Sequence, residues 1–217
     1  AGVTMDTVVR NQLSAGNNVL FCPTVASGTE TAVTQRKNMN TTSQLTVKMI
    51  QKAVATLKKN NVPTFNGDYV AIIHPYVAYD LQRDPEWIDA HKYAQPENLF
   101  TGEIGKVAGV RFVESTEAKV WKDSDCPQKS AGSGSDPATY YGVFSTLVLG
   151  KNAYGVTEVT GGGLQTIVKP LGAGEDPLNQ RSTVGWKGIR TAKILLEQNM
   201  VRIESVSAEW SGTVDAN

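Results

Sequence analysis

Residues 46–60 show the strongest helical periodicity in the chain. Apolar residues recur at the spacing of one helix face, and polar residues occupy the opposite face. The apolar face contains Met49, Ile50, Ala53, Val54 and Leu57, and the polar face contains Lys48, Gln51, Lys52, Lys58 and Lys59. Thr46 is expected to cap this helix, and Asn60-Asn61 followed by Pro63 ends it. The segment therefore predicts an amphipathic helix with one buried stripe.

A second set of signals predicts strands that lead directly into helices. Residues 68–73 are almost continuously apolar, which is typical of a strand covered on both faces. His74-Pro75 then favours a helix start, and Asp84-Pro85 repeats the same device before Trp87. The expected core of this α/β part consists of Val70, Ile72, Val77 and Leu81. Residues 110–114 alternate as a strand does, and residues 119–121 are a candidate extension of it.

The remaining segments complete a mixed pattern. A short helix is expected within residues 5–20, an irregular and exposed connection over 22–43, and a mobile Gly/Ser-rich loop over 122–138. Residues 140–149 and 164–168 predict largely buried strands, residues 182–191 a partly alternating strand, and Ile203 and Val206 the last strand. Helices and strands in this order predict an α+β fold, and no internal repeat is visible.

Composition limits the function classes. The 217 residues include 21 basic and 21 acidic side chains, and this balance lacks the positive excess of a dedicated nucleic-acid binder. Zero net charge also removes long-range repulsion between copies and favours self-association. No apolar run approaches the roughly 18 residues of a membrane span, and no signal-peptide pattern begins the chain, so an unsecreted protein without a membrane partner is expected. Cys22 and Cys126 predict free thiols.

The side chains that could carry chemistry are few. His74 is expected to cap a helix, and His91 to be a solvated surface residue; their 17-residue separation does not fit zinc spacing. Ser133 lies in a flexible Gly-Ser stretch rather than a nucleophile elbow. The acidic pairs of the loops, Asp123 with Asp125 and Glu175 with Asp176, are expected to be solvated. The sequence therefore predicts no catalytic, cofactor-binding or metal site, and a protein that is not an enzyme.

Residues 68–121 carry a specific resemblance. The strand ending in His74-Pro75, the Asp84-Pro85-Glu86-Trp87 restart, Gly102-Glu103-Ile104-Gly105 and Gly109-Val110-Arg111-Phe112-Val113-Glu114 are its main features. Val148-Leu149-Gly150-Lys151 with Ala153-Tyr154-Gly155 continues it. This block resembles major capsid proteins of tailed phages with the Hong Kong 97-like fold, in the branch typified by the large podophage N-four. The similarity extends over about residues 5–207.

The resemblance implies a structural subunit that self-assembles, as hexamers and pentamers, into the icosahedral shell around a phage genome. It implies a peripheral-domain helix, connection and second helix over 1–60, a mainly axial α/β domain over 61–150, and a β-rich return to the peripheral domain over 151–217. The implied partners are copies of the chain itself, scaffold, portal or decoration proteins, and packaged DNA contacted without sequence specificity. The implied locations are the virion and, before assembly, the host cytoplasm.

Two alternatives and one departure accompany this expectation. A nanocompartment shell of the same fold, resembling encapsulins, would enclose cargo enzymes, and an unrelated non-viral binding module would be a monomer with a surface groove. Family members usually carry an N-terminal arm and an extended β-hairpin before the first helix, and almost nothing precedes residue 5. The chain is therefore expected to be a fragment or processed form, or to replace those parts with residues 22–43.

Overall fold

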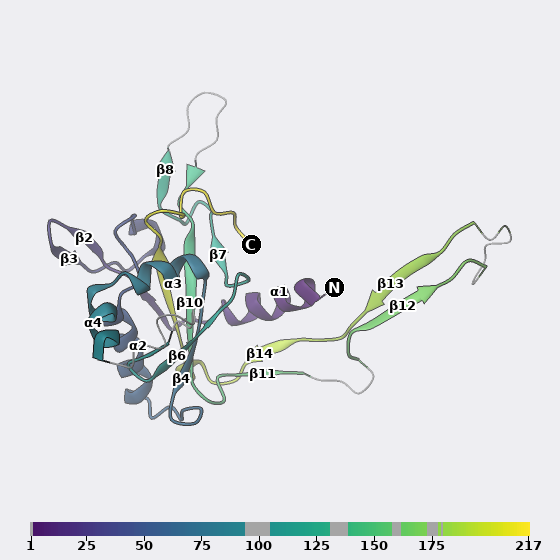
Figure 1. Ribbon diagram of the computed structural model, residues 1–217, viewed down its shortest axis with the longest axis horizontal. Helices are drawn as coiled ribbons and strands as arrows, with labels where there is room; N and C mark the ends of the chain where they lie inside the picture. Colours follow the sequence, from purple (N-terminus) through teal and green to yellow (C-terminus); the bar gives the residue numbers. More distant parts are fainter. Residues whose placement is uncertain (1, 94–104, 131–138, 158–161, 173–177, 179) are drawn as a thin grey trace.

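In the computed structural model, a seven-stranded mixed sheet forms the body of the protein, and a long two-stranded arm projects from it (Figure 1). The structure describes residues 2–93, 105–130, 139–157, 162–172, 178 and 180–217. In the helix that ends at residue 93, it describes the side chains up to residue 89. The helices are α1 (Gly2–Leu13), α2 (Val47–Lys59), α3 (Pro75–Gln82) and α4 (Pro85–Tyr93), with short 3-10 turns η1 (Arg36–Asn38) and η3 (Glu197–Asn199).

The main sheet has the order β1-β15-β10-β4-β6-β5, and β7 also pairs with β10. These strands are β1 (Val19–Phe21), β4 (Tyr69–Ile73), β5 (Lys106–Val107), β6 (Val110–Glu114), β7 (Val120–Trp121), β10 (Val143–Leu149) and β15 (Met200–Val206). β10 lies antiparallel to β15 and β4, whereas β1 is parallel to β15 and β4 is parallel to β6. The connection from β4 to β6 contains α3 and α4, as a parallel pair requires.

Four two-stranded ladders lie outside the main sheet. They are β2 (Thr24–Ala26) with β3 (Thr29–Thr31), β8 (Gln128–Ser130) with β9 (Thr139–Tyr140), β11 (Tyr154–Val156) with β14 (Ala192–Ile194), and β12 (Gln165–Lys169) with β13 (Thr183–Lys187). The β11–β14 ladder leaves the body and leads into β12–β13, which extends away from every other labelled element (Figure 1).

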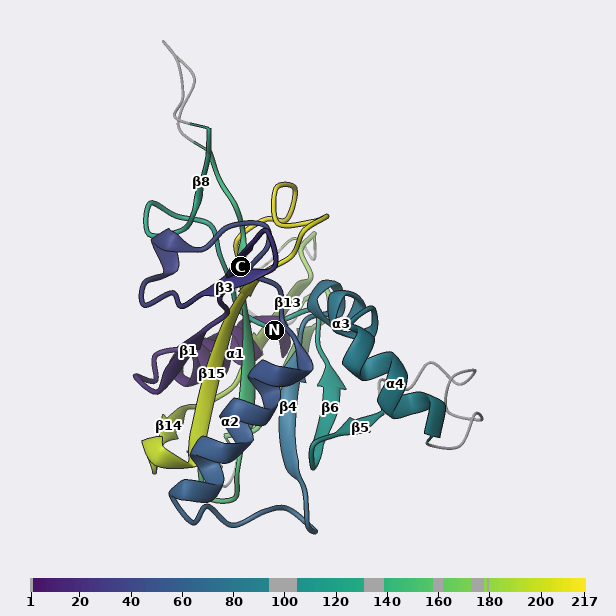
Figure 2. The same cartoon turned by 90° about the vertical axis from the view of Figure 1, so that its left-hand side faces the viewer.

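The two faces of the main sheet are covered differently. Helix α2 lies across one face over β15 and β4, and its apolar stripe joins α3 and α4 in the largest core cluster (Figure 2). Ile50, Ala53 and Leu57 are fully buried there, which confirms the predicted amphipathic helix. On the other face α1 packs with Leu13 against Leu147 and Met200 in a smaller cluster. The sheet therefore has one thickly covered face and one thinly covered face.

This unequal cover corrects one expectation about β4. Tyr69, Ala71 and Ile73 point to the α2 side and are buried, whereas Val70 and Ile72 point to the thinner side and are only half-buried. Val77 and Leu81 are buried as predicted. The apolar run did not distinguish the two faces, because an apolar residue fits a partly covered face as well as a fully covered one.

Several boundaries also differ from the predictions. The first helix ends at Leu13, and residues 19–21 form β1, because Leu20 pairs with Ile203 of the distant β15. Residues 22–43 contain the β2–β3 hairpin rather than only irregular chain. Residues 120–121 pair with β10 and do not extend β6. Thr46 occupies the cap position of α2, but the side chain of Asp84 accepts the hydrogen bond from the Val47 N–H, at 2.9 Å.

One loop prediction and one strand prediction differ from the structure in the described residues. Within 122–138, residues 128–130 form β8 and Cys126 is buried, so this part is not an open loop, and residues 131–138 lie outside the described residues. Residues 165–169 form a strand as predicted, but all five are exposed instead of buried. The first difference arises because β8 pairs with β9, and the second because β12 lies on an arm that projects from the body. Local composition reveals neither arrangement.

Candidate assembly surfaces

The arm, defined as β12 and β13, has one mostly apolar face and one mostly polar face. Directly paired residues of an antiparallel ladder lie on the same face, and faces alternate along each strand. The pairs Thr166 with Trp186 and Val168 with Val184 therefore share one face. Gln165, Ile167, Lys169, Thr183, Gly185 and Lys187 make up the other face. The arm thus has the alternating pattern of a strand pair that packs through its apolar face against another surface.

Nothing in the described part of the subunit covers the apolar face of the arm. Val168 is 63% exposed, Val184 74% and Trp186 49%, and all residues of both strands are exposed. An isolated two-stranded ribbon is only marginally stable in water, and exposed contiguous apolar surface on a soluble protein marks an interaction site. The apolar face of the arm is therefore the strongest candidate for a docking surface on this chain.

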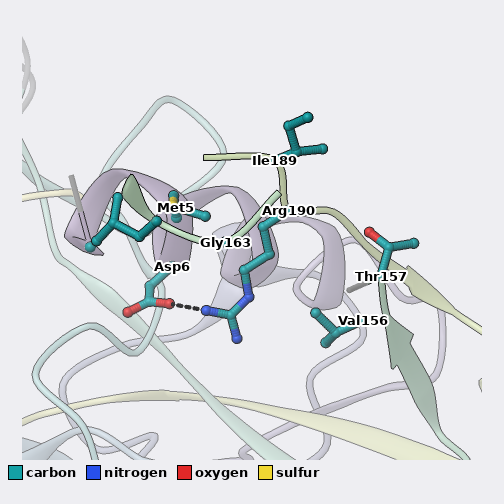
Figure 3. Close-up of a pocket in the computed structure, with 9 residues that line it drawn as sticks. Met5, Asp6, Val156, Thr157, Gly163, Ile189 and Arg190 are labelled. Atoms are coloured by element: carbon teal, nitrogen blue, oxygen red, sulfur yellow. Dashed lines mark hydrogen bonds and ion pairs between the residues drawn. The ribbon is translucent and has the colours of Figure 1, made fainter. Parts of the chain in front are cut away.

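The base of the arm is fixed to α1. The Asp6 carboxylate accepts a hydrogen bond from the Arg190 guanidinium at 3.3 Å, and Figure 3 shows the two side chains reaching toward each other. A side chain at Gly188 would place its Cβ 2.9 Å from the sulfur of Met5, so the chain passes closely over α1 there. In the β11–β14 ladder, which leads from the body to the arm, Tyr154 and Ile194 pack against the cluster that contains Leu13. The arm is therefore anchored at its base and unsupported along its length.

A cavity of about 500 Å³ lies beside this anchor. Met5, Val156 and Ile189 provide apolar walls, and the Asp6–Arg190 pair provides the charged groups (Figure 3). Among the described residues, the lining contains no histidine, cysteine or serine. In the parts of the chain that the structure describes, no group of three His, Cys, Asp or Glu side chains is placed to hold a metal ion.

The body contains a buried ionic cluster. Glu204 of β15 is fully buried and accepts hydrogen bonds from Arg36 at 2.7 and 2.8 Å and from Arg202 at 3.0 Å. Both guanidinium groups lie over the ring of Trp121, and that of Arg36 is 4.0 Å from its centroid. Arg202 also donates to the carbonyl oxygens of Ser14 and Gly16 just after α1. The cluster ties the 22–43 segment and the end of α1 to the sheet.

The residues singled out for chemistry occupy structural positions. His74 caps α3 by accepting a hydrogen bond at Nδ1 from the Tyr76 N–H, at 3.2 Å, which confirms its predicted role, and burial lowers its pKa. Cys22 and Cys126 are free and buried. Burial raises the pKa of both thiols, that of Cys126 to about 12, so neither forms a reactive thiolate near neutral pH.

The acidic pair of the 122–130 segment serves the backbone. Asp123 accepts a hydrogen bond from the Asp125 N–H at 3.1 Å and another from the Cys126 thiol. Ser133, Glu175, Asp176 and the side chain of His91 lie outside the described residues, so the structure does not place them. The Cys126 thiol and the Asp123 carboxylate are therefore brought together, whereas the placed histidine, His74, lies at the start of α3.

An aromatic patch marks a second exposed surface, at the start of α3. The rings of Tyr76 and Trp210 stack with centroids 4.7 Å apart, and Tyr79 meets Trp210 edge-on at 4.8 Å. The guanidinium of Arg83 lies 5.2 Å from the centroid of the Tyr79 ring. Aromatic and arginine side chains are enriched at protein interfaces. The sequence alone indicates neither this patch nor the exposed arm, since exposure depends on which segments meet in the fold.

Helices long and apolar enough to cross a membrane are not found among the described residues. The sequence matches the family described as phage capsid protein over residues 3–186. No curated protein matches the chain.

Solved capsid structures share the fold at low sequence identity. The acid-stable capsid of Helicobacter pylori bacteriophage KHP30 superimposes with a TM-score of 0.62 at 12% identity, covering 94% of this chain and 66% of that one. The capsid of Cyanophage P-SCSP1u superimposes with a TM-score of 0.59 at 17% identity, covering 94% of this chain and 62% of that one. The structure from Mycobacterium phage Che8 superimposes with a TM-score of 0.53 at 15% identity, covering 93% of this chain and 58% of that one.

The chain thus spans about three fifths of the length of the structures that it resembles. The expected Hong Kong 97-like α+β fold is confirmed, whereas the podophage branch stays a prediction, because the matched structures do not single it out. With a family match over most of its length and the fold of capsid subunits, the chain belongs to the phage capsid protein family.

Proposed function

We propose that the chain is the structural part of a major capsid protein that self-assembles, as hexamers and pentamers, into the icosahedral shell around a phage genome. Family membership supports a shell subunit, and the uncovered apolar face of the arm is the observation that carries the proposal to this chain. A shell subunit acts through repeated contacts with copies of itself, so a surface that is unstable alone and identical on every copy fits this role.

The occupant of the apolar face of the arm is a second copy of this chain. Formal net charge is zero, so copies approach without long-range repulsion, and the arm reaches well beyond the body of its own subunit (Figure 1). Val168, Val184 and Trp186 provide an apolar centre, and the lysines of the opposite face stay in water. Burial of these three side chains contributes modestly to each contact, about 1.5–3 kcal/mol for a full valine, and many such contacts add up in a shell.

Residues 61–150 are proposed as the mainly axial part, directed to the capsomer centre, and residues 1–60 and 151–217, which include α1, α2 and the arm, as the peripheral part. The chain is proposed not to be an enzyme. Scaffold, portal or decoration proteins and non-specifically contacted DNA are the further proposed partners, and the host cytoplasm is the proposed site before assembly. The phage capsid family favours this proposal over a cargo-enclosing shell, and the exposed apolar face of the arm favours it over a monomeric binding module.

A charge placed on either face of the arm tests the proposal. In the full-length protein, Val184→Asp adds a carboxylate to the apolar face, and Thr183→Asp adds one to the polar face next to it. Electron microscopy is expected to show shells for wild type and Thr183→Asp, and folded but unassembled subunits for Val184→Asp. Shells formed equally well by both variants would contradict the arm contact, and a wild-type protein that stays monomeric would overturn the shell function.

A further inference from the structure

The outward face of α2 carries a lysine stripe, defined as Lys48, Lys52, Lys58 and Lys59. All four are exposed, and α2 contains no acidic residue. Lys48, Lys52 and Lys59 recur at steps of four and seven residues, so they lie along one line of the helix surface. With a rise of 1.5 Å per residue, the line extends over about 16 Å. In a chain of zero net charge, this is a concentrated positive surface.

The stability of the helix does not account for the stripe. Cations are favourable near the last turn of a helix, which suits Lys58 and Lys59, but they are unfavourable near the first turn, where Lys48 lies. Lys48 and Lys52 also repel each other at a spacing of four residues. Among the four lysines of the stripe, only Lys48 has an ion pair with a described residue, the exposed Glu30. The electrostatic interactions of Lys48 and Lys52 within α2 are therefore unfavourable, and Lys52 has no ion pair among the described residues to offset them, which points to a role outside the subunit.

The position of the stripe makes it available to a large partner. The apolar side of α2 is buried on the sheet, so its lysine side faces away from the body (Figure 2). The exposed positions between the lysines are Gln51 and Ala55, and no large apolar or aromatic side chain of α2 is exposed. Protein partners usually take aromatic or large apolar anchors, whereas a phosphate backbone needs only a row of positive charges. The stripe lacks apolar and aromatic anchors and provides a row of positive charges.

We propose that the lysine stripe of α2 is the surface with which the subunit contacts the phosphates of duplex DNA, and that α2 therefore faces the interior of the shell. This inference rests on the proposed shell function and adds the orientation of the subunit to it. Lysine ammonium groups are point charges on flexible stems, so they bind phosphates without reading base sequence. An acidic polypeptide is the competing polyanion, and the experiment includes it.

Binding of a fluorescent 30-base-pair duplex by the full-length unassembled protein tests the proposal. Lys52→Gln with Lys59→Gln removes two charges from the stripe while keeping good helix formers. Lys129→Gln with Lys193→Gln removes two exposed charges elsewhere and is the matched control. Each lost phosphate contact lowers the slope of log affinity against log salt by about 0.9. The stripe variant is expected to bind at least about tenfold more weakly at low salt, with a slope smaller by about 2. The control is expected to stay within about twofold of wild type.

Equal weakening of both variants, or no binding by wild type, would overturn the proposal, because the effect would then follow net charge or be absent. Polyglutamate that binds wild type as tightly as the duplex would also overturn it, in favour of an acidic protein. Circular dichroism checks that α2 is retained. Electron microscopy of the same preparations after assembly separates the two proposals. Shells with unchanged DNA affinity in the stripe variant reject the DNA surface alone, and absent shells in wild type reject the shell function.

Discussion

β10 in the body and β13 in the arm have similar β-forming sequences and opposite surroundings. All seven residues of β10 are buried, whereas all five of β13 are exposed. β10 lies between β15 and β4 and is covered on both faces, and β13 has a partner strand on one edge only. The comparison shows that the apolar residues of the body stabilise the subunit, while those of the arm remain available for another molecule.

The largest expected effect comes from the buried ionic cluster of the body. Glu204→Ala removes the carboxylate that Arg36 and Arg202 share, so the buried guanidinium of Arg202 and the partly buried one of Arg36 lose their anionic partner. Loss of one partner from a buried ion pair destabilises by about 3–5 kcal/mol. Urea unfolding of the unassembled subunit measures this loss in the free energy of unfolding. Glu30→Ala breaks the exposed pair with Lys48 and is the control, with an expected loss below about 1 kcal/mol. Similar losses in the two variants would show that the cluster does not stabilise the body.

A matched pair of isoleucines compares the two regions directly. Ile203 of β15 is fully buried, and Ile167 of β12 is 43% exposed. Ile203→Ala is expected to lower the free energy of unfolding by about 2–5 kcal/mol, because it leaves a cavity in a packed core. Ile167→Ala is expected to change it by less than about 0.5 kcal/mol. Chemical denaturation of the unassembled subunit measures both values, and an equal loss would mean that the arm is part of the folding core.

The sequence predicted these two regions unequally. Helix α2, the start of α3 at His74-Pro75 and strands β6, β10 and β15 were predictable, because local periodicity and capping chemistry determine them. The exposure of residues 165–169 was not, since a strand exposed on an arm and a buried strand share the same residue preferences. The Arg36–Glu204 pair joins residues 168 positions apart, so no local pattern indicates it. The candidate docking face therefore came from the structure, and the shell function from the resemblance of residues 68–121.

A smaller, pH-dependent effect is expected in the body alone. Burial lowers the pKa of His74 below its usual value, so the unfolded chain binds a proton there more readily than the folded chain. Stability from this group is complete above pH 6.5 and is lost as the pH falls from there through the lowered pKa. Thermal unfolding at pH 7.5 and pH 5 measures the loss. His74→Asn replaces the capping Nδ1 with a side-chain oxygen acceptor and removes the titration, so its pH dependence is expected to be weaker; an unchanged dependence would assign the loss to other groups.

Hydrogen exchange of the arm before and after assembly tests the central claim most directly. Peptides from residues 165–169 and 183–187 are compared with peptides from 143–149 in the full-length protein, as free subunits and as shells. The account predicts rapid exchange of the arm in free subunits and at least about tenfold slower exchange in shells, with β10 slow in both, because only the arm gains cover on assembly. An arm that exchanges equally fast in both states would contradict the claim that a second copy covers its apolar face.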